Sequence, residues 1–199
     1  MIKNFYPGKF IVFEGPDGSG QSTQASFLAE FFMKNGKDIV VTKEPTQTSE
    51  AGKRIKKILE EKIEIDPMKL QKLYVDDREE HLNSLIIPAL KKGSIVICDR
   101  YLFSTLAFGK AHGADLEELI KMNDNFLYPD LIFFLNVDAK ICIERIEKRA
   151  DPKTLFEKEE RLAKVLKNYQ DLALRFENIK VIDGEKSKEE VFEQIKSYL

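Results

Sequence analysis

Residues 11–24 read IVFEGPDGSGQSTQ, and this stretch decides how the chain is interpreted. An apolar run ends in a glycine-rich turn, and Ser22 and Thr23 follow it. The arrangement is typical of the phosphate-binding loop G-x-x-x-x-G-K-[ST], which lies between a strand and a helix. That pattern requires lysine where this chain has Gln21. The stretch therefore indicates a nucleotide-binding loop with one residue replaced, an inactive one, or an accidental match.

The rest of the loop favours phosphate binding over a merely structural corner between strand and helix. Its glycines let backbone amides converge without Cβ clashes, so most of the cradle survives the loss of lysine. Hydrogen bonds involving charge stabilise by roughly 1.5–3 kcal/mol, against about 1 for neutral ones. A loss of activity on the order of tenfold to a hundredfold is therefore expected, unless another cation replaces the lysine. The expected ATP-binding residues of the loop are Gly15, Gly18, Ser19, Gly20, Gln21, Ser22 and Thr23.

The bulk composition limits the class of protein. A chain of 199 residues suits one domain, residues 1–199, with a sizeable core. The 32 basic and 34 acidic residues give a net charge of −2, so no nucleic-acid surface is expected. No signal region or membrane-spanning run is found, which favours a cytoplasmic protein. Cys98 and Cys142 are too few for a disulfide framework and are expected to be buried thiols.

Short apolar runs separated by long helical patterns predict an α/β fold. Five runs rich in β-branched or aromatic residues suit strands buried on both faces of a parallel sheet: 10–13, 39–42, 95–98, 131–135 and 179–182. Helix signals lie between them. Asp66-Pro67 opens a helix that runs towards Gly93 and should be kinked at Pro88. Apolar spacing predicts another helix over 155–176, and a capping box at 187–190 begins the last.

Two pairs of residues outside the loop are candidates for the site. Asp99 and Arg100 end the third run, at the carboxyl edge of the sheet, where ligands and Mg²⁺ are usually approached. A structural ion pair is the alternative. Tyr74 and Arg78 are four residues apart and share a helix face, which suits a stacked base whose ring oxygen accepts hydrogen bonds. A tyrosine at the core edge beside a solvated arginine is the alternative.

A locally basic segment over about 145–158 is a candidate lid. It contains Arg145, Arg149 and Lys153, and in most proteins such a run is a solvated helix face. Here the loop lacks its lysine, and a lid over the phosphates could supply a cation in its place.

Together these motifs resemble the thymidylate kinase family, P-loop enzymes that phosphorylate dTMP with ATP. The matching stretches run in order along the whole chain: FEGPDGSGQSTQ, TKEPT, LYVDDR, CDRYLFSTLAF, PDLIFFLNVD, FEKEERLAKVLKNYQDLA and VIDGEKSKEEV. The pattern D-R-Y-x-x-S-x-x-A-[FY] is the most discriminating of them. The resemblance implies a three-layer P-loop NTPase fold with a five-stranded parallel sheet flanked by helices, and a homodimer.

The resemblance also implies roles for single residues. In dTMP binding, Asp17 would hold the sugar hydroxyl, Tyr74 would stack on thymine and Arg78 would reach a base oxygen. The remaining expected dTMP contacts are Lys43, Arg100, Ser104, Thr105 and Phe108. Ser22 and Asp99 would hold Mg²⁺, and Arg145 or Arg149 would lie against ATP. The expected catalytic group is Arg100, Asp99, Gln21, Arg149 and Lys153.

The chain departs from the family pattern at three positions. Gln21 replaces the loop lysine, Lys43 replaces a common arginine, and Gly109 stands where glutamine is often found. The leading expectation is a dTMP kinase that uses Mg²⁺ and ATP. The alternatives are a kinase for another pyrimidine deoxynucleotide or for a deoxynucleoside, and a catalytically silent nucleotide-binding homologue.

Overall fold

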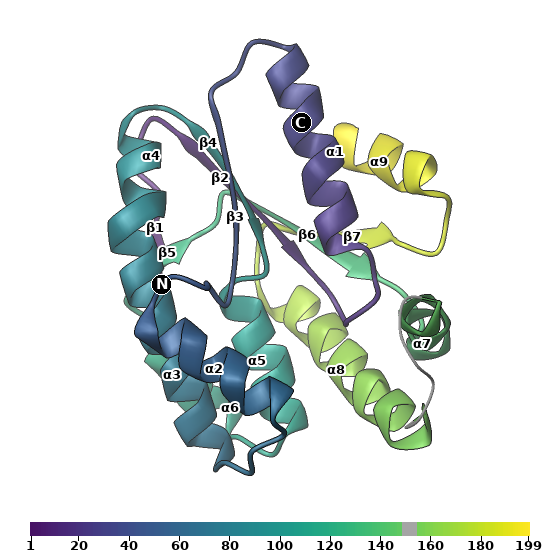
Figure 1. Cartoon of the computed structure of the whole chain (residues 1–199). Helices are drawn as coiled ribbons and strands as arrows, with labels where there is room; N and C mark the ends of the chain where they lie inside the picture. Colours follow the sequence, from purple (N-terminus) through teal and green to yellow (C-terminus); the bar gives the residue numbers. More distant parts are fainter. Residues whose placement is uncertain (149–154) are drawn as a thin grey trace.

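The computed structural model describes residues 1–148 and 155–199, and in the second range it describes side chains from residue 159 onward. Strands and helices alternate along the chain (Figure 1). The strands are β1 (Ile2–Lys3), β2 (Lys9–Glu14), β3 (Ile39–Lys43), β4 (Ile95–Asp99), β5 (Leu127–Tyr128), β6 (Leu131–Asn136) and β7 (Ile179–Asp183). The helices are α1 (Gln21–Lys34), α2 (Glu50–Glu60), α3 (Pro67–His81), the π-helical turn η1 (Leu82–Ile86), α4 (Ile87–Lys91), α5 (Leu102–Ala111), α6 (Leu116–Met122), α7 (Ala139–Glu147), α8 (Leu155–Arg175) and α9 (Lys188–Lys196).

The main sheet is the predicted five-stranded parallel sheet. Its strand order is β3-β4-β2-β6-β7, and every neighbouring pair is parallel. Strand β2, which leads into the glycine loop, is central, with Val12 opposite both Cys98 and Ile132. All five predicted runs are strands of this sheet. The separate pairing of β1 with β5 was not predicted, because two-residue strands show no periodicity.

Helices cover both faces of the sheet, which gives the expected three layers (Figure 1). Helices α1 and α9 pack on one face, where Ile11 and Phe13 of β2 belong to their core cluster. On the other face, Phe10 and Val12 belong to the larger cluster with α4, α5 and α8. Because neighbouring residues of a strand point to opposite faces, a continuous apolar run fills two cores at once.

The prediction that all five strands are buried on both faces is wrong for the two edge strands. Val41 of β3 is 53% exposed and Val181 of β7 is 50% exposed. An edge strand has a neighbour on one side only, and the covering helices do not reach past it. The central strands β2, β4 and β6 are buried almost throughout.

The predicted helix from Asp66 towards Gly93 is divided into three segments. The Asp66 side chain caps α3 by accepting a hydrogen bond from the Lys69 N–H at 3.0 Å, as predicted. The helix changes to π-helical geometry in η1, just before Pro88, and resumes as α4. Proline lacks an N–H and its ring crowds the preceding turn, so the irregularity falls before the proline itself. Gly93 ends the helix in a left-handed conformation, with φ 88°.

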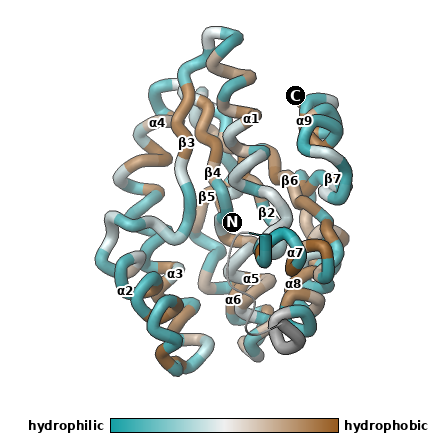
Figure 2. The backbone as a smooth tube through the Cα atoms, turned by 45° about the vertical axis from the view of Figure 1, so that its right-hand side comes forward, coloured by the Kyte–Doolittle hydropathy of each residue, from teal (hydrophilic) through white to brown (hydrophobic). Residues whose placement is uncertain are grey.

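The chain's hydropathy follows these layers. Figure 2 shows brown, apolar backbone concentrated in the central strands, and teal, hydrophilic stretches on the outer helices. Among the described residues, no helix is both long enough and apolar enough to span a membrane. Cys98 and Cys142 are unbonded and buried, as predicted. The capping box of Ser187 and Glu190 begins α9 as expected.

Candidate active site

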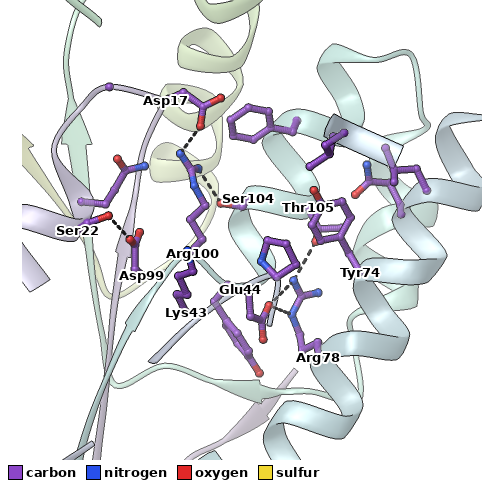
Figure 3. Close-up of a pocket in the computed structure, with 18 of the residues that line it drawn as sticks. Asp17, Ser22, Lys43, Glu44, Tyr74, Arg78, Asp99, Arg100, Ser104 and Thr105 are labelled. Carbon is purple, nitrogen blue, oxygen red and sulfur yellow. Dashed lines mark hydrogen bonds and ion pairs between the residues drawn. The ribbon is translucent and has the colours of Figure 1, made fainter. Parts of the chain in front are cut away.

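The carboxyl ends of β2, β3 and β4 open onto a cavity of about 430 Å³ (Figure 3). Its walls come from the glycine loop, the ends of β3 and β4, and helices α3 and α5. The sequence-predicted residues that line it are Asp17, Gly18, Gly20, Gln21, Ser22, Thr23, Lys43, Tyr74, Arg78, Asp99, Arg100, Ser104, Thr105 and Phe108. Gly15, Ser19 and Arg145 are not among the lining residues, and Arg149 and Lys153 lie outside the described residues.

The glycine loop has no room for larger residues at two of its glycines. A Cβ at Gly18, where φ is 88°, would lie 2.6 Å from the Cys142 carbonyl oxygen. A Cβ at Gly15 would lie 2.5 Å from the Ser19 hydroxyl. Arg145 of α7 supports the loop from behind, because its guanidinium donates to the carbonyl oxygens of Gly184 at 3.0 Å and Ser19 at 3.5 Å. The loop leads directly into the N-terminus of α1, where the backbone N–H groups can bind an anion.

Gln21 is the first residue of α1 and is buried, with 5% of its surface exposed. Its side-chain amide donates a hydrogen bond of 2.7 Å to the Gly15 carbonyl oxygen. The substituted residue therefore fits the loop, and its hydrogen bond joins the first glycine of the loop to the first turn of α1. It contributes a neutral amide where a lysine would contribute a charge.

Ser22 and Asp99 meet beside this loop (Figure 3). The Ser22 hydroxyl donates to Asp99 Oδ2. Register places Asp99 at the end of β4, opposite Phe13 of β2, so the sheet itself brings the carboxylate to α1. A hydroxyl and a carboxylate oxygen at one point are the hard ligands that Mg²⁺ takes, usually with phosphate oxygens and water. Within the ranges that the structure describes, no group of three or more His, Cys, Asp or Glu side chains could hold a metal ion.

Arg100 crosses the cavity between the loop and α5. Its guanidinium donates to Asp17 Oδ1 at 2.7 Å, to the Gly15 carbonyl oxygen at 2.8 Å and to the Ser104 hydroxyl at 3.2 Å. It also lies 5.2 Å from the centre of the Phe108 ring. Burial by itself would lower the pKa of Arg100. The surrounding carboxylates, Asp17 first, outweigh this effect and raise the pKa overall. The structure thus presents a permanent cation next to the glycine loop.

Glu14, which the sequence analysis missed, fixes the start of α5. It is 1% exposed, and Oε1 accepts from the backbone N–H groups of Tyr101 at 3.0 Å and Ser104 at 3.2 Å. Oε2 accepts from the hydroxyls of Ser104 at 2.6 Å and Tyr169 at 2.9 Å. Burial raises the pKa of Glu14 to about 7, although the Ser104 hydrogen bond and the Arg100 charge oppose the rise. The only sequence signal was an acidic residue at the end of an apolar run.

Tyr74 and Arg78 share a face of α3 as predicted, but Arg78 is neither solvated nor free. It is 1% exposed, and its Nε donates to Glu44 Oε2 at 2.9 Å. Its other donors reach Asn123 Oδ1 at 2.5 Å and the Thr105 hydroxyl at 2.9 Å. Arg78 therefore belongs to the cavity wall, where Glu44, Asn123 and Thr105 hold its guanidinium in place. Burial raises the pKa of Tyr74 to about 12, so its ring stays neutral and is suited to stacking.

Eight further lining residues were not predicted: Glu44, Pro45, Leu59, Leu70, Gln71, Tyr101, His112 and Arg161. Glu44 follows β3 and is only 5% exposed, between Arg78 and His81. Its neighbours in the sequence, Lys43 and Pro45, gave no sign of that pairing. Gln71 lies one helical turn before Tyr74, and this spacing could have identified it. Arg161 comes from α8, and lone residues of an amphipathic helix carry no distinguishing pattern.

Comparison with known proteins gives the same family in each case. A family described as thymidylate kinase matches residues 13–195. A "Probable thymidylate kinase" of Pyrococcus abyssi is 40% identical over 193 residues, covering 94% of each chain. A "Probable thymidylate kinase" of Thermococcus onnurineus is 43% identical over 196 residues, again covering 94% of each. A "Thymidylate kinase" of Caldicellulosiruptor saccharolyticus is 34% identical over 198 residues, covering 96% of each.

Proposed function

Since the chain belongs to the thymidylate kinase family, we propose that it transfers the γ-phosphoryl group of ATP to the phosphate of dTMP in the cavity beside the glycine loop. One observation carries this assignment. A single cavity joins the helix N-terminus after the glycine loop, the Ser22–Asp99 pair and Arg100 to a slot beside Tyr74. That order suits a donor phosphate, an acceptor phosphate and a planar base.

The glycine loop would hold the phosphates of ATP. Asp17 to Thr23 would contribute backbone N–H groups, and Arg145 would keep the loop in place through the Ser19 carbonyl. Ser22 and Asp99 would hold Mg²⁺, which fits their two adjoining oxygens. When bound, Mg²⁺ neutralises charge on the β- and γ-phosphates.

Arg100 would hold the acceptor phosphate of dTMP, with Lys43 and Ser104 beside it. Asp17 would accept a hydrogen bond from the 3′-hydroxyl of the sugar. This bond would replace part of the present contact between Asp17 and Arg100. Phe108 would press on the sugar, a contact that disfavours a ribonucleotide. Tyr74 would stack on thymine, and Arg78 would act on a base oxygen through Thr105.

The reaction needs positioning and charge more than proton transfer. A phosphate oxygen is already nucleophilic, so no general base is required. The residues of the cavity would align the two phosphates in line and exclude water, and the Arg100 guanidinium would stabilise the charge on the transferring group.

The missing loop lysine is replaced in part, on this proposal, by Arg145, Arg149 or Lys153 of the segment 145–158. Gln21→Lys is expected to raise kcat less than tenfold if a second cation already follows the phosphoryl group. Single neutral variants of the three basic residues should each be assayed beside it. If none of them lowered kcat while Gln21→Lys raised it sharply, the replacement idea would be wrong.

A coupled assay of ADP release tests the function directly. The protein, with Mg²⁺ and ATP, is offered dTMP, dUMP, dCMP, AMP and thymidine in turn. Saturable turnover with dTMP above all others is the expected result. A preference for dUMP or thymidine would favour the alternative kinases, and binding of ATP without turnover would favour a silent homologue.

The remaining proposals concern the whole chain. We propose one kinase domain over residues 1–199, assembled as a homodimer, in the cytoplasm and without a nucleic-acid partner. Two buried free thiols suit a reducing compartment, and a net charge of −2 offers no general attraction to nucleic acid. Sedimentation equilibrium would distinguish a dimer from a monomer of 23.0 kDa.

A further inference from the structure

The cavity has cationic side chains other than the one that its loop lacks. The Gln21 amide already donates to the Gly15 carbonyl oxygen at 2.7 Å. A neutral amide also stabilises the charge on a transferring phosphoryl group less than an ammonium does. Within the described residues, four lysine or arginine side chains line the cavity: Lys43, Arg78, Arg100 and Arg161.

The three arginines are committed elsewhere or lie too far from the loop. Three hydrogen bonds hold Arg78 in the wall, at the base end of the cavity. Arg100 is assigned to the acceptor phosphate, between the loop and α5. Arg161 lies near His112, the residue that ends α5. The ten residues of α5 separate its two ends by about 15 Å, so Arg161 is remote from the loop.

Strand register places Lys43 close to the expected Mg²⁺ ligands. Lys43 ends β3 and pairs with Asp99, which ends β4 and pairs in turn with Phe13 of β2. Paired residues of neighbouring strands point to the same face, and Asp99 points towards α1, where it meets Ser22. Neighbouring strands are only about 4.8 Å apart, so Lys43 starts one strand away from the Ser22–Asp99 pair. Figure 3 shows Lys43 and Asp99 next to each other at this edge of the sheet.

The Lys43 ammonium is free to move. Lys43 is exposed and, among the described residues, makes no ion pair and no side-chain hydrogen bond. Two nearby carboxylates are already paired, Glu44 with Arg78 at 2.8 Å and Asp17 with Arg100 at 2.7 Å. A lysine carries a compact charge on a flexible four-carbon stem. This side chain can therefore follow an anion across the cavity instead of holding it in one place.

We propose that Lys43 is the catalytic cation that the loop lacks, with its ammonium following the γ-phosphoryl group from ATP to dTMP. In this step the bond from the γ-phosphorus to the bridging oxygen of ADP breaks, and a bond to an oxygen of the dTMP phosphate forms. Lys43 exchanges no proton and stabilises the negative charge on the equatorial oxygens. The inference rests on the proposed function, since it requires phosphoryl transfer in this cavity. It places a cation on β3 in addition to any from the segment 145–158.

The variant Lys43→Gln tests this role, because glutamine stays polar and loses the charge. The single-turnover rate at saturating ATP, dTMP and Mg²⁺ should fall about tenfold to a hundredfold, because an ammonium is exchanged for a neutral donor. KM for dTMP should change less than about threefold. A side chain that only held the dTMP phosphate would instead raise this KM and leave the saturated rate unchanged.

Moving the lysine back to the loop gives a second, independent readout. In Gln21→Lys the loop has its own cation, so Lys43→Gln added to it should lower the single-turnover rate by less than about threefold. The cost of losing Lys43 thus depends on residue 21. A merely structural role for Lys43 would lower the rate by the same factor in both backgrounds.

Lys9→Gln is the matched control for the change in net charge. Lys9 is also exposed and without an ion pair among the described residues, but it begins β2, at the opposite edge of the sheet. Its variant should change the single-turnover rate by less than about twofold.

Three outcomes overturn the inference: an unchanged saturated rate in Lys43→Gln, an equal fall in both backgrounds, or a similar fall in Lys9→Gln. If Gln21→Lys does not fold, the division of the Lys43→Gln effect between rate and KM decides by itself. Failure of the proposed function looks different, because the wild-type protein would then show no turnover of dTMP at all.

Discussion

The buried carboxyl of Glu14 should make the stability of the protein depend on pH. Burial raises its pKa to about 7, from an ordinary value of 4.5. Between these values the folded protein keeps a proton that the unfolded chain releases. Folding stability from this group is therefore greatest below about pH 4.5, falls as the pH rises towards 7, and levels off above that.

The size of the effect follows from the two pKa values. Linkage gives a loss of folding free energy of about 2–3 kcal/mol between pH 5 and pH 8 for this group alone. The variant Glu14→Gln stays neutral throughout, so it removes this contribution. Any constant cost from altered contacts to Ser104 and Tyr169 appears equally at both pH values and cancels in the comparison.

Urea unfolding of the wild type and of Glu14→Gln at pH 5 and pH 8 measures the difference. The unfolding free energy of the wild type relative to the variant should fall by about 2–3 kcal/mol from the lower pH to the higher. A difference that is constant to within about 0.5 kcal/mol would show a carboxyl with an ordinary pKa. A wild type that gains on the variant as pH rises would show that the Arg100 charge dominates, and would also refute the reasoning.

Three other substitutions have defined outcomes. Ser22→Ala should raise the Mg²⁺ concentration for half-maximal turnover about tenfold, because one oxygen ligand is lost; an unchanged metal titration would contradict this. Asp77→Ala should lower the unfolding free energy by about 2–4 kcal/mol in urea, since its buried carboxylate accepts from both the N–H and the hydroxyl of Thr46, at 2.8 Å and 2.5 Å. Gly8→Ala should lower it by about 1–3 kcal/mol, because the new Cβ would lie 2.3 Å from a backbone oxygen before β4. A change below about 0.5 kcal/mol would refute the hydrogen-bond argument for Asp77 or the packing argument for Gly8.

Local sequence patterns predicted the strands of the main sheet, the position of the site and the starts of two helices. The runs around Phe10–Phe13 and Leu131–Leu135 are continuous and short, and glycine or helix signals bound them, so they could be predicted as strands of a parallel sheet without coordinates. The glycine loop fixed the position of the site at the end of β2. Asp66 and Ser187 marked helix starts correctly, because capping depends on only a few neighbouring residues.

Partners distant in the sequence could not be predicted. Glu14 and Tyr169 are 155 residues apart, and only the packing of α8 on the sheet brings the phenol to the carboxylate. The burial of Arg78 could not be predicted, because its own helix gives no sign of Glu44, which is 34 residues earlier and follows β3. Gln71 packs against Gly109 of the facing helix α5, a contact that neither helix indicates by itself. To predict each of these contacts, one must first know which helices and strands pack against one another.

The π-helical turn η1 amounts to one extra residue inserted in a long helix. In an uninterrupted α-helix Leu85, seven residues after Arg78, would share its face; instead Leu85 is 38% exposed and Ile86 is fully buried. The turn thus rotates the second half of the helix by about 100° relative to the first. A deletion of one residue from 82–86 would let the helix continue as a regular α-helix with Ile86 seven residues after Arg78, so Ile86 and Leu90 would stay in the core. Loss of one residue here would therefore keep the cavity-facing and buried sides of the helix aligned, and alignments of relatives should be checked for a one-residue gap at this turn.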